Sequence, residues 1–319
     1  MRVVVTGSSG FIGRHVAARL AKETIDVYAV SYRHSNVADT SNIQHISGDL
    51  RDPHFADAVT KSADVVIHLA GLAHARFAAD DYGQVNVKAT ENVAKAAIRN
   101  GVSSFVFASS ISVYGPCQDG AVSEASSCHP VTDYGRSKLQ AEDVLTNLSA
   151  GSHMNVSILR LSTVYGAGDP GNVSRLIRSV QRLGPIVVGR GANLKSLIHV
   201  DNIAELIVSL IGRDLPHFDV VNVGDPAPYS LSTIVETVAD VRGDRRPTVR
   251  VPLGVSMAGA GSLELLWGAA GRKPPISRDQ VAKLTESAVV DVTHLRDAYG
   301  FTSRILLREG IQRTLGLLS

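Results

Sequence analysis

A glycine-rich turn near the start of the sequence limits this chain to few architectures. A β-branched run over residues 2–5 predicts a buried strand, and the apolar spacing over residues 14–20 predicts a helix. Between them, Gly7 allows a tight turn, Gly10 lets a pyrophosphate approach the backbone, and Gly13 lets the helix pack closely on the strand. This context predicts a dinucleotide site, with the phosphates at the helix N-terminus.

Strands and helices alternate through the first two thirds of the chain, which predicts an α/β fold with a doubly wound parallel sheet. Further strands are expected over residues 26–30, 42–46, 64–71, 105–109, 156–161 and 220–224. A helix is expected from about Val173, and another over residues 203–211, started by Asp201 and Asn202. The composition shifts after residue 166. We therefore expect a dinucleotide-binding Rossmann domain over residues 1–166, to which 196–225 return, and a smaller C-terminal α/β region over 167–195 and 226–319.

The end of the second strand bears on the choice of cofactor. Ser31, Tyr32 and Arg33 follow it, with no acidic residue. In this architecture an acid there binds the ribose 2′-hydroxyl of NAD, whereas a nearby arginine accommodates the 2′-phosphate of NADP. Arg33 therefore favours NADP over NAD, unless it is an ordinary solvated arginine. Asp49, after the third strand, can accept from an adenine amino group; alternatively Asp49 or Asp52 caps the next helix.

Tyr134 and Lys138 stand four residues apart in a segment whose apolar residues recur at helical spacing. Positions i and i+4 lie on one face of a helix, so the phenol and the ammonium are expected side by side. A phenol has a pKa of about 10, and a neighbouring positive charge lowers that pKa. Such a pair can take a proton from an alcohol or give one to a ketone. The alternative is a packed tyrosine beside a solvated lysine.

Two strand ends carry small and hydroxyl side chains. The fifth strand runs into a loop with Ser109, Ser110 and Ser112. Hydroxyls at the carboxyl edge of a central strand face the ligand crevice, although any one of them can instead cap a turn. The fourth strand ends in His-Leu-Ala-Gly, whose small residues let the backbone approach a cofactor; His68 is expected to be packed rather than catalytic.

Composition excludes several classes of function. The net charge is +2 with interspersed charges, so neither a nucleic-acid patch nor a polybasic membrane anchor is expected. The first strand begins at Arg2, leaving no room for a signal peptide, and the apolar stretches are too short to span a bilayer. Cys117 and Cys128 lack metal-type spacing, so no metal is expected, and a disulfide stays open. A reducing cytoplasm is the expected location.

Eight motifs occur in order along the chain: Thr6-Gly7-x-x-Gly10-Phe11-Ile12-Gly13, Asp49, His68-Leu-Ala-Gly71, Asn86, Ser109-Ser110, Tyr134-x-x-x-Lys138, Val164-Tyr165-Gly166 and Ile198-His199-Val200-Asp201. Together they resemble the extended short-chain dehydrogenase/reductases that act on nucleotide sugars, the group that contains UDP-galactose 4-epimerases. The resemblance covers nearly the whole chain, strongly to about residue 225.

The resemblance implies roles for the matching residues. Tyr134 transfers the proton of the reacting oxygen, while Lys138 lowers its pKa and binds the nicotinamide ribose. Ser110 holds the C4 oxygen, with Ser112 as an assistant. Contact with the dinucleotide is implied for Gly7, Gly10, Phe11, Ile12, Arg33, Asp49, Leu50, Leu69, Ala70, Gly71, Asn86, Tyr134 and Lys138.

The resemblance also assigns the second region and the assembly. Residues 167–195 and 226–319 are expected to bind the nucleotide sugar. Asn172 and Val173 are expected near its diphosphate, and Lys195 replaces a diphosphate-binding arginine of the family. A homodimer is implied, through helices that include residues 86–100 and 134–148.

Two departures from the family pattern suggest a loosely held cofactor. Ser31 stands where tight-binding 4-epimerases have an acid, and Ala73 stands where many carry a lysine. Loose binding suits a reductase that exchanges NADPH for NADP in each turnover, whereas an epimerase keeps its cofactor. The tail over residues 283–291 resembles the branch found beside bacterial O-antigen genes, which includes 4-ketoreductases making N-acetylquinovosamine-type sugars.

These comparisons with the family imply hydride transfer at C4 of a UDP-sugar. The departures favour an NADPH-dependent UDP-4-keto-6-deoxyhexosamine 4-reductase in surface-polysaccharide synthesis; the alternative is a UDP-hexose or UDP-N-acetylhexosamine 4-epimerase. A dehydratase is disfavoured, because that chemistry generally places Asp-Glu after the active-site hydroxyl, and here Ile111 and Ser112 follow it. A non-catalytic dinucleotide sensor is a further alternative, although such proteins typically lose the tyrosine or the lysine.

Overall fold

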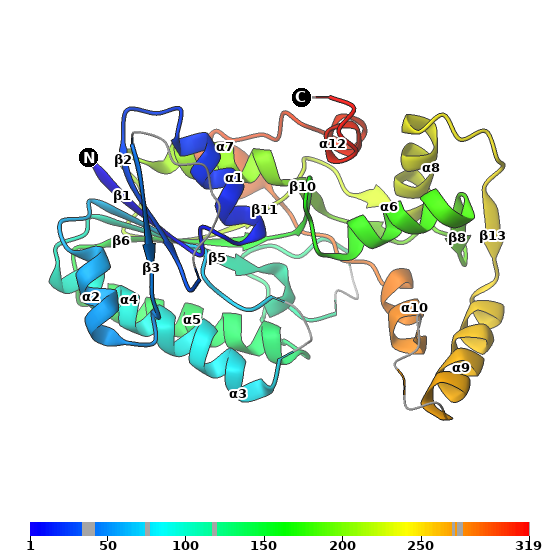
Figure 1. The fold of residues 1–319 in the computed structure, drawn as a ribbon, viewed down its shortest axis with the longest axis horizontal. Coiled ribbons are helices and arrows are strands. Elements are labelled where there is room, and N and C mark those ends of the chain that lie inside the picture. The colour runs from blue at the N-terminus through cyan, green and yellow to red at the C-terminus, as the bar shows by residue number, and fades with distance from the viewer. Residues whose placement is uncertain (34–41, 74–76, 117–119, 270–271, 273–276, 319) are drawn as a thin grey trace.

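The structure, a computed structural model, is built on a seven-stranded parallel sheet (Figure 1). It describes residues 1–33, 42–73, 77–116, 120–269, 272 and 277–318. The strand order is β11-β6-β5-β4-β1-β2-β3. The strands are β1 (Arg2–Thr6), β2 (Asp26–Ser31), β3 (Ile43–Ser47), β4 (Val65–His68), β5 (Ser104–Ser110), β6 (Asn155–Leu161) and β11 (Phe218–Val223). The predicted α/β fold with a doubly wound sheet is confirmed.

The strand order decides where a ligand crevice opens. The chain builds outward from β1 to β3 on one side, then crosses to β4 and builds outward on the other side. In a sheet of this kind, the crevice lies at the carboxyl ends of the strands where the order reverses. That point falls between β1 and β4, next to the glycine turn after β1 and the small-residue turn after β4.

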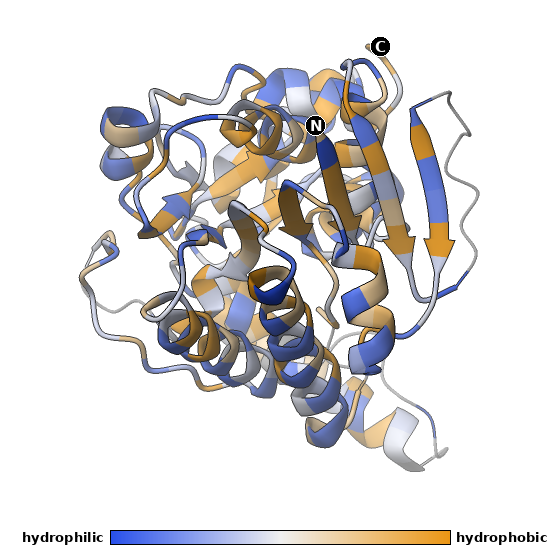
Figure 2. Cartoon of the chain, turned by 90° about the vertical axis from the view of Figure 1, so that its left-hand side faces the viewer, coloured by the Kyte–Doolittle hydropathy of each residue, from blue (hydrophilic) through white to orange (hydrophobic). Residues whose placement is uncertain are grey.

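Helices cover both faces of the sheet (Figures 1 and 2). Because side chains alternate along a strand, Val3 and Val5 pack into one core and Val4 into the other. The first core is closed by α1 (Phe11–Leu20), α7 (Val200–Leu210) and α11 (Thr293–Tyr299). The second core is closed by α2 (Pro53–Thr60), α4 (Ala89–Arg99) and α5 (Asp133–Ser149).

A smaller lobe lies beside the sheet (Figure 1). Its core includes Tyr165 and Leu197 together with side chains from three helices. The elements of the lobe, with the two-stranded sheets that belong to it, are β7 (Thr163–Tyr165), α6 (Asn172–Leu183), β8 (Ile186–Val188), β9 (Leu194–Lys195), β10 (Leu197–His199), β12 (Tyr229–Ser230), α8 (Leu231–Val241), β13 (Val249–Val251), α9 (Leu253–Ala269), α10 (Arg278–Thr285) and α12 (Leu307–Thr314). Leu295 and Tyr299 of α11, late in the chain, pack in the core of the sheet instead.

Two predicted helix starts are corrected by the structure. The helix expected over residues 86–100 begins earlier, as α3 (Ala79–Tyr82), and passes through a π-helical turn (Gly83–Lys88) into α4. Helix α7 begins at Val200 and is capped by the ring of His199, which accepts from the Asp201 N–H at 3.3 Å. Asp201 is the second residue of the helix rather than its cap, and its carboxylate accepts from His15 at 2.7 Å.

Two further expectations concern the cysteines and the membrane. Cys117 lies outside the described residues, and Cys128 is half-buried, so the disulfide stays open. Among the helices of the described part of the chain, none combines the length and the apolar character needed to cross a bilayer.

Candidate active site

The turn after β1 packs directly on the segment after β4. Gly7 has a φ of +69°, and a Cβ built there would lie 2.7 Å from the Ala70 nitrogen. A Cβ on Gly13 would lie 2.1 Å from the Gly7 carbonyl oxygen, so α1 approaches the turn as closely as only glycine permits. Gly10, which has no side chain, is the N-cap of α1. The first-turn N–H groups therefore suit a phosphate, and the turn fits the diphosphate of a dinucleotide.

His68 ties this turn to the neighbouring helix. It is fully buried, and its ring lies 2.8 Å from the Thr6 hydroxyl and 2.9 Å from the Thr90 hydroxyl. Thr90 donates to the Asn86 carbonyl at 2.7 Å, so Nε2 of His68 carries the proton and Nδ1 accepts from Thr6. Burial lowers the pKa of His68 to about 3, which keeps the ring neutral. The packed position expected for His68 agrees with this geometry.

Asn86 holds the turn after β4 against α5. Its side-chain oxygen accepts from the Leu72 N–H at 2.7 Å, and its nitrogen donates to the Leu72 carbonyl and the Ser137 hydroxyl. A Cβ on Gly71 would lie 3.1 Å from the Asn86 oxygen and 3.4 Å from Nζ of Lys138. Gly71, Asn86 and Lys138, assigned separately from the sequence, therefore converge at one place.

Lys138 is buried at the carboxyl end of β5. Its Nζ donates to the Ala108 carbonyl at 2.7 Å and lies 4.6 Å from the centre of the Phe107 ring. Burial lowers the pKa of Lys138 to about 8, and the Glu142 carboxylate opposes that shift. The ammonium form therefore predominates at neutral pH, in an environment that strengthens its electrostatic effect.

Tyr134 hydrogen-bonds with Ser110, and its ring lies 6.3 Å from the Tyr82 ring. Burial raises the pKa of Tyr134, and the bond from Ser110 lowers it in part. The expected lowering by Lys138 is corrected: in this geometry the ammonium is engaged with Ala108, and burial of the phenol dominates. Ser110 also caps the short 3₁₀ turn Ile111–Val113, and its hydroxyl oxygen lies 3.1 Å from that of Ser112. Tyr134, Ser110 and Ser112 thus form one hydroxyl cluster.

Gly135 brings α5 against that 3₁₀ turn. A Cβ at Gly135 would lie 2.5 Å from the Ser112 carbonyl oxygen and 3.0 Å from Cβ of Pro130. Both contacts involve atoms close to the backbone, so an added methyl group has to move the helix or the turn.

We expect Gly135→Ala to lower turnover by about 10–100-fold, because displacement by even 1 Å separates Tyr134 from Ser110. Steady-state kinetics, with circular dichroism to monitor folding, measure the effect. Gly151→Ala is the matched control, since a Cβ there meets nothing within 4 Å. Full activity of Gly135→Ala would show that the close contact does not position Tyr134.

The carboxyl ends of β2 and β3 form the edge assigned to the adenosine ribose. Ser31 is buried and donates to the Arg33 carbonyl at 2.7 Å, while the Arg33 side chain is exposed. Asp49 forms a two-pronged ion pair with Arg51, which holds the pKa of Asp49 below its usual value. Sequence reasoning missed Arg51, whose guanidinium lies 5.9 Å from the centre of the Tyr32 ring. Leu50, also assigned here, is buried in the core.

The structure shows which of Asp49 and Asp52 caps helix α2. Asp52 is the N-cap of α2 and accepts from the His54 N–H at 2.9 Å. Asp49 instead accepts from the Arg51 side chain and, at 2.9 Å, from the Arg51 N–H.

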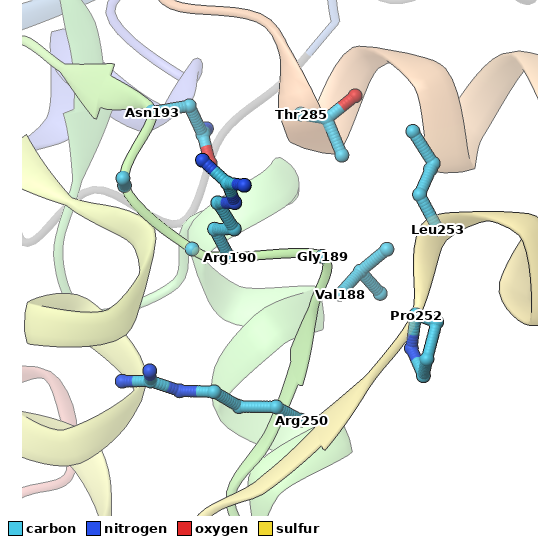
Figure 3. Close-up of a pocket in the computed structure, with 10 residues that line it drawn as sticks. Val188, Gly189, Arg190, Asn193, Arg250, Pro252, Leu253 and Thr285 are labelled. Atoms are coloured by element: carbon cyan, nitrogen blue, oxygen red, sulfur yellow. The ribbon is translucent and has the colours of Figure 1, made fainter.

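The residues assigned to the substrate lie in the smaller lobe. Asn172 is the first residue of α6, and Val173 packs its side chain into the lobe core, which leaves only its backbone for a ligand. Lys195 donates to the Lys283 carbonyl at 3.1 Å. Nearby, a cavity of about 490 Å³ is bordered by two arginines that sequence reasoning missed, Arg190 and Arg250 (Figure 3).

A buried ion pair extends from the active-site helix, and sequence reasoning missed it too. Glu142 accepts from the Ser109 hydroxyl and from two nitrogens of Arg160, the shorter distance being 2.6 Å. Arg160 also donates to the Tyr114 hydroxyl at 2.9 Å, which donates to Asn222 at 2.7 Å. One signal was available: Glu142 follows Lys138 by four residues and shares its helix face.

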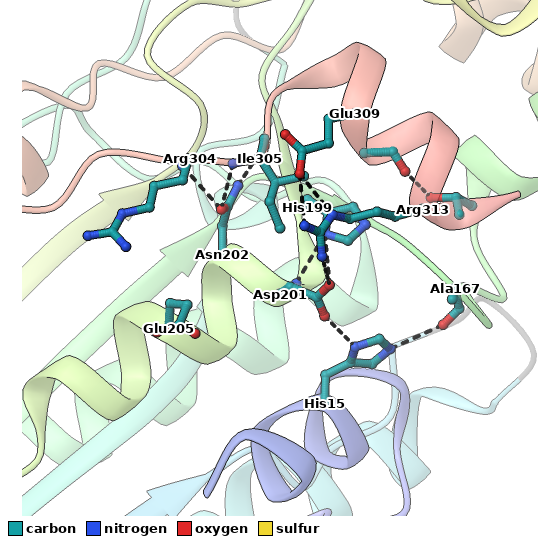
Figure 4. Close-up of polar contacts among 12 residues, drawn as sticks. His15, Ala167, His199, Asp201, Asn202, Glu205, Arg304, Ile305, Glu309 and Arg313 are labelled. Atoms are coloured by element: carbon teal, nitrogen blue, oxygen red, sulfur yellow. Dashed lines mark hydrogen bonds and ion pairs between the residues drawn. The ribbon is translucent and has the colours of Figure 1, made fainter. Parts of the chain in front are cut away.

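A second polar junction joins the glycine-turn helix to the end of the chain (Figure 4). Asp201 accepts from His15 at 2.7 Å and lies 3.9 Å from Arg313 of α12. The side chain of Asn202 accepts from the backbone N–H of Ile305 and donates to its carbonyl. The Ile-His-Val-Asp stretch is therefore a structural connection between α1, α7 and the C-terminal segment.

Comparisons with known proteins place this geometry in context. Residues 3–224 match the NAD dependent epimerase/dehydratase family. The chain is 30% identical over 323 residues to a UDP-glucose 4-epimerase of Vibrio cholerae, covering 98% of this chain and 94% of the relative. It is 28% identical over 316 residues, with the same coverages, to the N-acetyl-α-D-glucosaminyl-diphospho-ditrans,octacis-undecaprenol 4-epimerase of Escherichia coli O157:H7.

A solved structure is similar to this chain in both fold and sequence. MoeE5 in complex with UDP-glucuronic acid and NAD superposes with a TM-score of 0.79 at 30% identity, covering 99% of this chain and 98% of that one. The relatives of this chain are enzymes of the oxidoreductase and epimerase type. That type of enzyme agrees with the crevice at the strand ends and with the hydroxyl cluster and buried lysine at the end of β5. This chain belongs to the NAD dependent epimerase/dehydratase family.

Proposed function

We propose that this enzyme transfers hydride at C4 of a UDP-sugar, with Tyr134 moving the proton of the C4 oxygen. Tyr134, Ser110 and Lys138 lie together at the carboxyl end of β5, beside the turns that fit a dinucleotide. Relatives and solved structures with UDP-sugars in their names support this substrate class. A bound nicotinamide supplies the hydride donor or acceptor.

Each residue of the cluster has a distinct task in this proposal. Ser110 orients the C4 oxygen toward Tyr134, and Ser112 supports the Ser110 hydroxyl. Tyr134, whose pKa is raised by burial, is protonated at neutral pH and so is prepared to donate a proton to a ketone oxygen. Lys138, positively charged and buried, stabilises negative charge that develops on that oxygen.

The finer proposal is an NADPH-dependent reduction of a UDP-4-keto-6-deoxyhexosamine in surface-polysaccharide synthesis. The observation that carries it is the end of β2, where Ser31 replaces an acid and the exposed Arg33 supplies positive charge, while Arg51 is paired with Asp49. A 2′-phosphate is attracted by Arg33, whereas a carboxylate in place of Ser31 would repel it.

The second candidate is a 4-epimerase that uses NAD. The names of the two curated relatives favour it, one acting on UDP-glucose and one on a lipid-linked N-acetylglucosamine. The solved relative MoeE5, which was determined with NAD, favours it as well. An epimerase needs the same Tyr134 first as a base and then as an acid.

The cofactor state of the purified enzyme tests these two candidates against each other. We expect little bound cofactor, consumption of one NADPH per 4-keto sugar reduced, and a KM for NADPH at least about tenfold below that for NADH. Stoichiometric bound NAD, together with UDP-glucose epimerisation without added cofactor, would show that the enzyme is the epimerase.

Ser31→Asp is the matched variant for this test. A carboxylate at that place repels the 2′-phosphate and accepts from the ribose hydroxyl, so we expect the preference to shift toward NADH. If Ser31→Asp keeps the wild-type preference between NADPH and NADH, the residue at the end of β2 does not select the cofactor, whichever reaction the enzyme performs.

Other parts of the proposal follow from the resemblance to the family. We propose that residues 1–166 with 196–225 hold the dinucleotide, and that residues 167–195 and 226–319 hold the UDP-sugar through Asn172, the Val173 backbone and Lys195. We further propose a homodimer through α4 and α5, and a cytoplasmic location. Sedimentation velocity of the purified enzyme measures the oligomeric state.

A further inference from the structure

We propose that α9 docks this enzyme on the surface of a membrane that contains anionic phospholipid. The helix lies at the end of the smaller lobe, beside α10 and away from the sheet (Figure 1). Among its 17 residues, only Glu264 is charged. Large apolar side chains are exposed along it: Leu265 is 75% exposed, Leu266 65% and Val255 62%.

The one charged side chain of α9 faces the protein. Glu264 accepts from the Arg278 N–H at 2.8 Å, and its carboxylate lies 3.8 Å from the Arg278 guanidinium. Gly261, on the same side, packs against the Arg278 side chain, where an added Cβ would lie 2.1 Å from a guanidinium nitrogen. The contacts with α10 therefore leave the outer side of α9 apolar.

The exposed residues do not form an ordinary amphipathic pattern. Val255 and Leu266 are eleven positions apart and share one side of the helix, since eleven residues make about three turns. Leu265 and Trp267 extend the apolar surface to either side of Leu266. A helix that is apolar nearly all round requires burial in an apolar medium. By contrast, α8 buries its own apolar residues, including Ile234 and Val238, in the lobe core.

The positive charge of the segments on either side of α9 favours binding to an anionic membrane surface. Residues 242–283 contain eight Lys and Arg against three Asp and Glu, whereas the whole chain has 32 against 30. Arg245, Arg250 and Arg272, on both sides of α9 in the sequence, are exposed. A second copy seated on α9 by two-fold symmetry would bring two such basic segments together, which is unfavourable. Anionic lipid headgroups instead complement them.

The length of α9 indicates binding in one leaflet. Seventeen residues at 1.5 Å each make a helix of about 25 Å, shorter than a hydrocarbon core of about 30 Å. Trp267, near the C-terminal end, is of the type favoured at the boundary between headgroups and acyl chains. Pro252 and Leu253, at the other end, line the cavity between Arg190 and Arg250 (Figure 3). Docking through α9 thus holds that cavity next to the membrane surface.

Trp267 makes the test direct because it is the only tryptophan in the chain. Phosphatidylcholine vesicles with about 30% phosphatidylglycerol are added to the full-length enzyme, and fluorescence and co-sedimentation are measured. We expect a blue shift of Trp267 emission, quenching by brominated acyl chains, and binding that weakens as salt is raised. Pure phosphatidylcholine is expected to bind several-fold more weakly.

Variants separate the apolar and the charged contributions. Leu265→Ser with Leu266→Ser is expected to weaken vesicle binding by at least about tenfold, because two large apolar side chains are lost. Leu183→Ser on α6 is the matched control, since Leu183 is 62% exposed on another helix of the lobe. Arg245→Gln and Arg272→Gln are each expected to weaken binding about fivefold.

Three outcomes overturn the proposal. The first is wild-type enzyme that shows neither the Trp267 shift nor co-sedimentation with the anionic vesicles. The second is equal loss of binding in the Leu183 control and in the α9 variant. The third is a Trp267 blue shift that depends on protein concentration without vesicles and is lost in the α9 variant, which would assign α9 to self-association. The wild-type fluorescence result stands even where a variant fails to fold.

Discussion

Tyr134→Phe is expected to lower turnover by about 10²–10⁴-fold, the usual contribution of a positioned proton donor. The substitution removes only the hydroxyl that hydrogen-bonds with Ser110 and keeps the ring that packs 6.3 Å from Tyr82. We therefore expect binding of the sugar nucleotide and the unfolding temperature to change little. Single-turnover rates with a 4-keto sugar and reduced cofactor measure the chemical step.

The control for this experiment is Tyr82→Phe. Tyr82 is a buried tyrosine beside Tyr134, and it has no role in the proposed chemistry. Its loss of a hydroxyl is expected to lower turnover less than about tenfold, because that hydroxyl takes no part in the proposed proton transfer. If the two variants lose activity equally, or if Tyr134→Phe stays fully active, Tyr134 is not the proton donor. A non-catalytic dinucleotide sensor would instead show no turnover in either the wild type or the variant.

Arg160→Met is expected to reduce the free energy of unfolding by about 3–5 kcal/mol, because it leaves a buried carboxylate without its partner. Glu142 and Arg160 are 5% and 8% exposed at their side chains. The substitution also removes a donor to Tyr114, which lies between Arg160 and Asn222. Urea unfolding monitored by circular dichroism measures the loss.

Two further variants separate burial from charge. Arg160→Met combined with Glu142→Leu removes both charges, and it is expected to recover much of the lost stability. Arg99→Met breaks a pair with Asp57 in which both side chains are about half exposed, so its effect is expected to stay within about 1 kcal/mol. An equal loss in Arg160→Met and Arg99→Met would contradict the buried-pair account.

The pair also bears on the active site, because Ser109 and Glu142 join β5 to α5. Ser109 directly precedes Ser110, and Glu142 follows Lys138 by one helical turn on the same face. Loss of the pair is therefore expected to lower activity in addition to stability. The double variant, which restores packing without charge, indicates how much of that loss comes from positioning.

Much of the fold follows from local pattern. The strands were predictable from short β-branched runs, and the helices from apolar residues at helical spacing. The turn was predictable because the close approach of backbone at Gly7 and Gly13 leaves no room for a side chain. The starts of α4 and α7 were not predictable to the residue. A π-helical turn precedes α4, and the N-cap of α7 is His199, which is not one of the usual capping residues Ser, Thr, Asp and Asn.

Much of the candidate site depends on contacts that cross the sheet. Arg51 lies against the Tyr32 ring because β2 and β3 pair in one particular register, with Ser31 opposite Ser47. Arg160 meets Glu142 because alternate side chains of β6 face α5. The pKa of Tyr134 was expected to fall from its spacing to Lys138 alone, but burial, which spacing does not report, raises it.

The amino-acid sequence by itself determined the order of strands and helices, the phosphate-binding turn and the Tyr134–Lys138 spacing. These features depend on residues within about one turn or one strand of each other. Only the tertiary structure decided which charges are buried together, which cations lie at the cofactor edge, and that α9 is left exposed. Burial and proximity across distant segments set those properties, because desolvation and Coulomb energies depend on the whole surrounding fold.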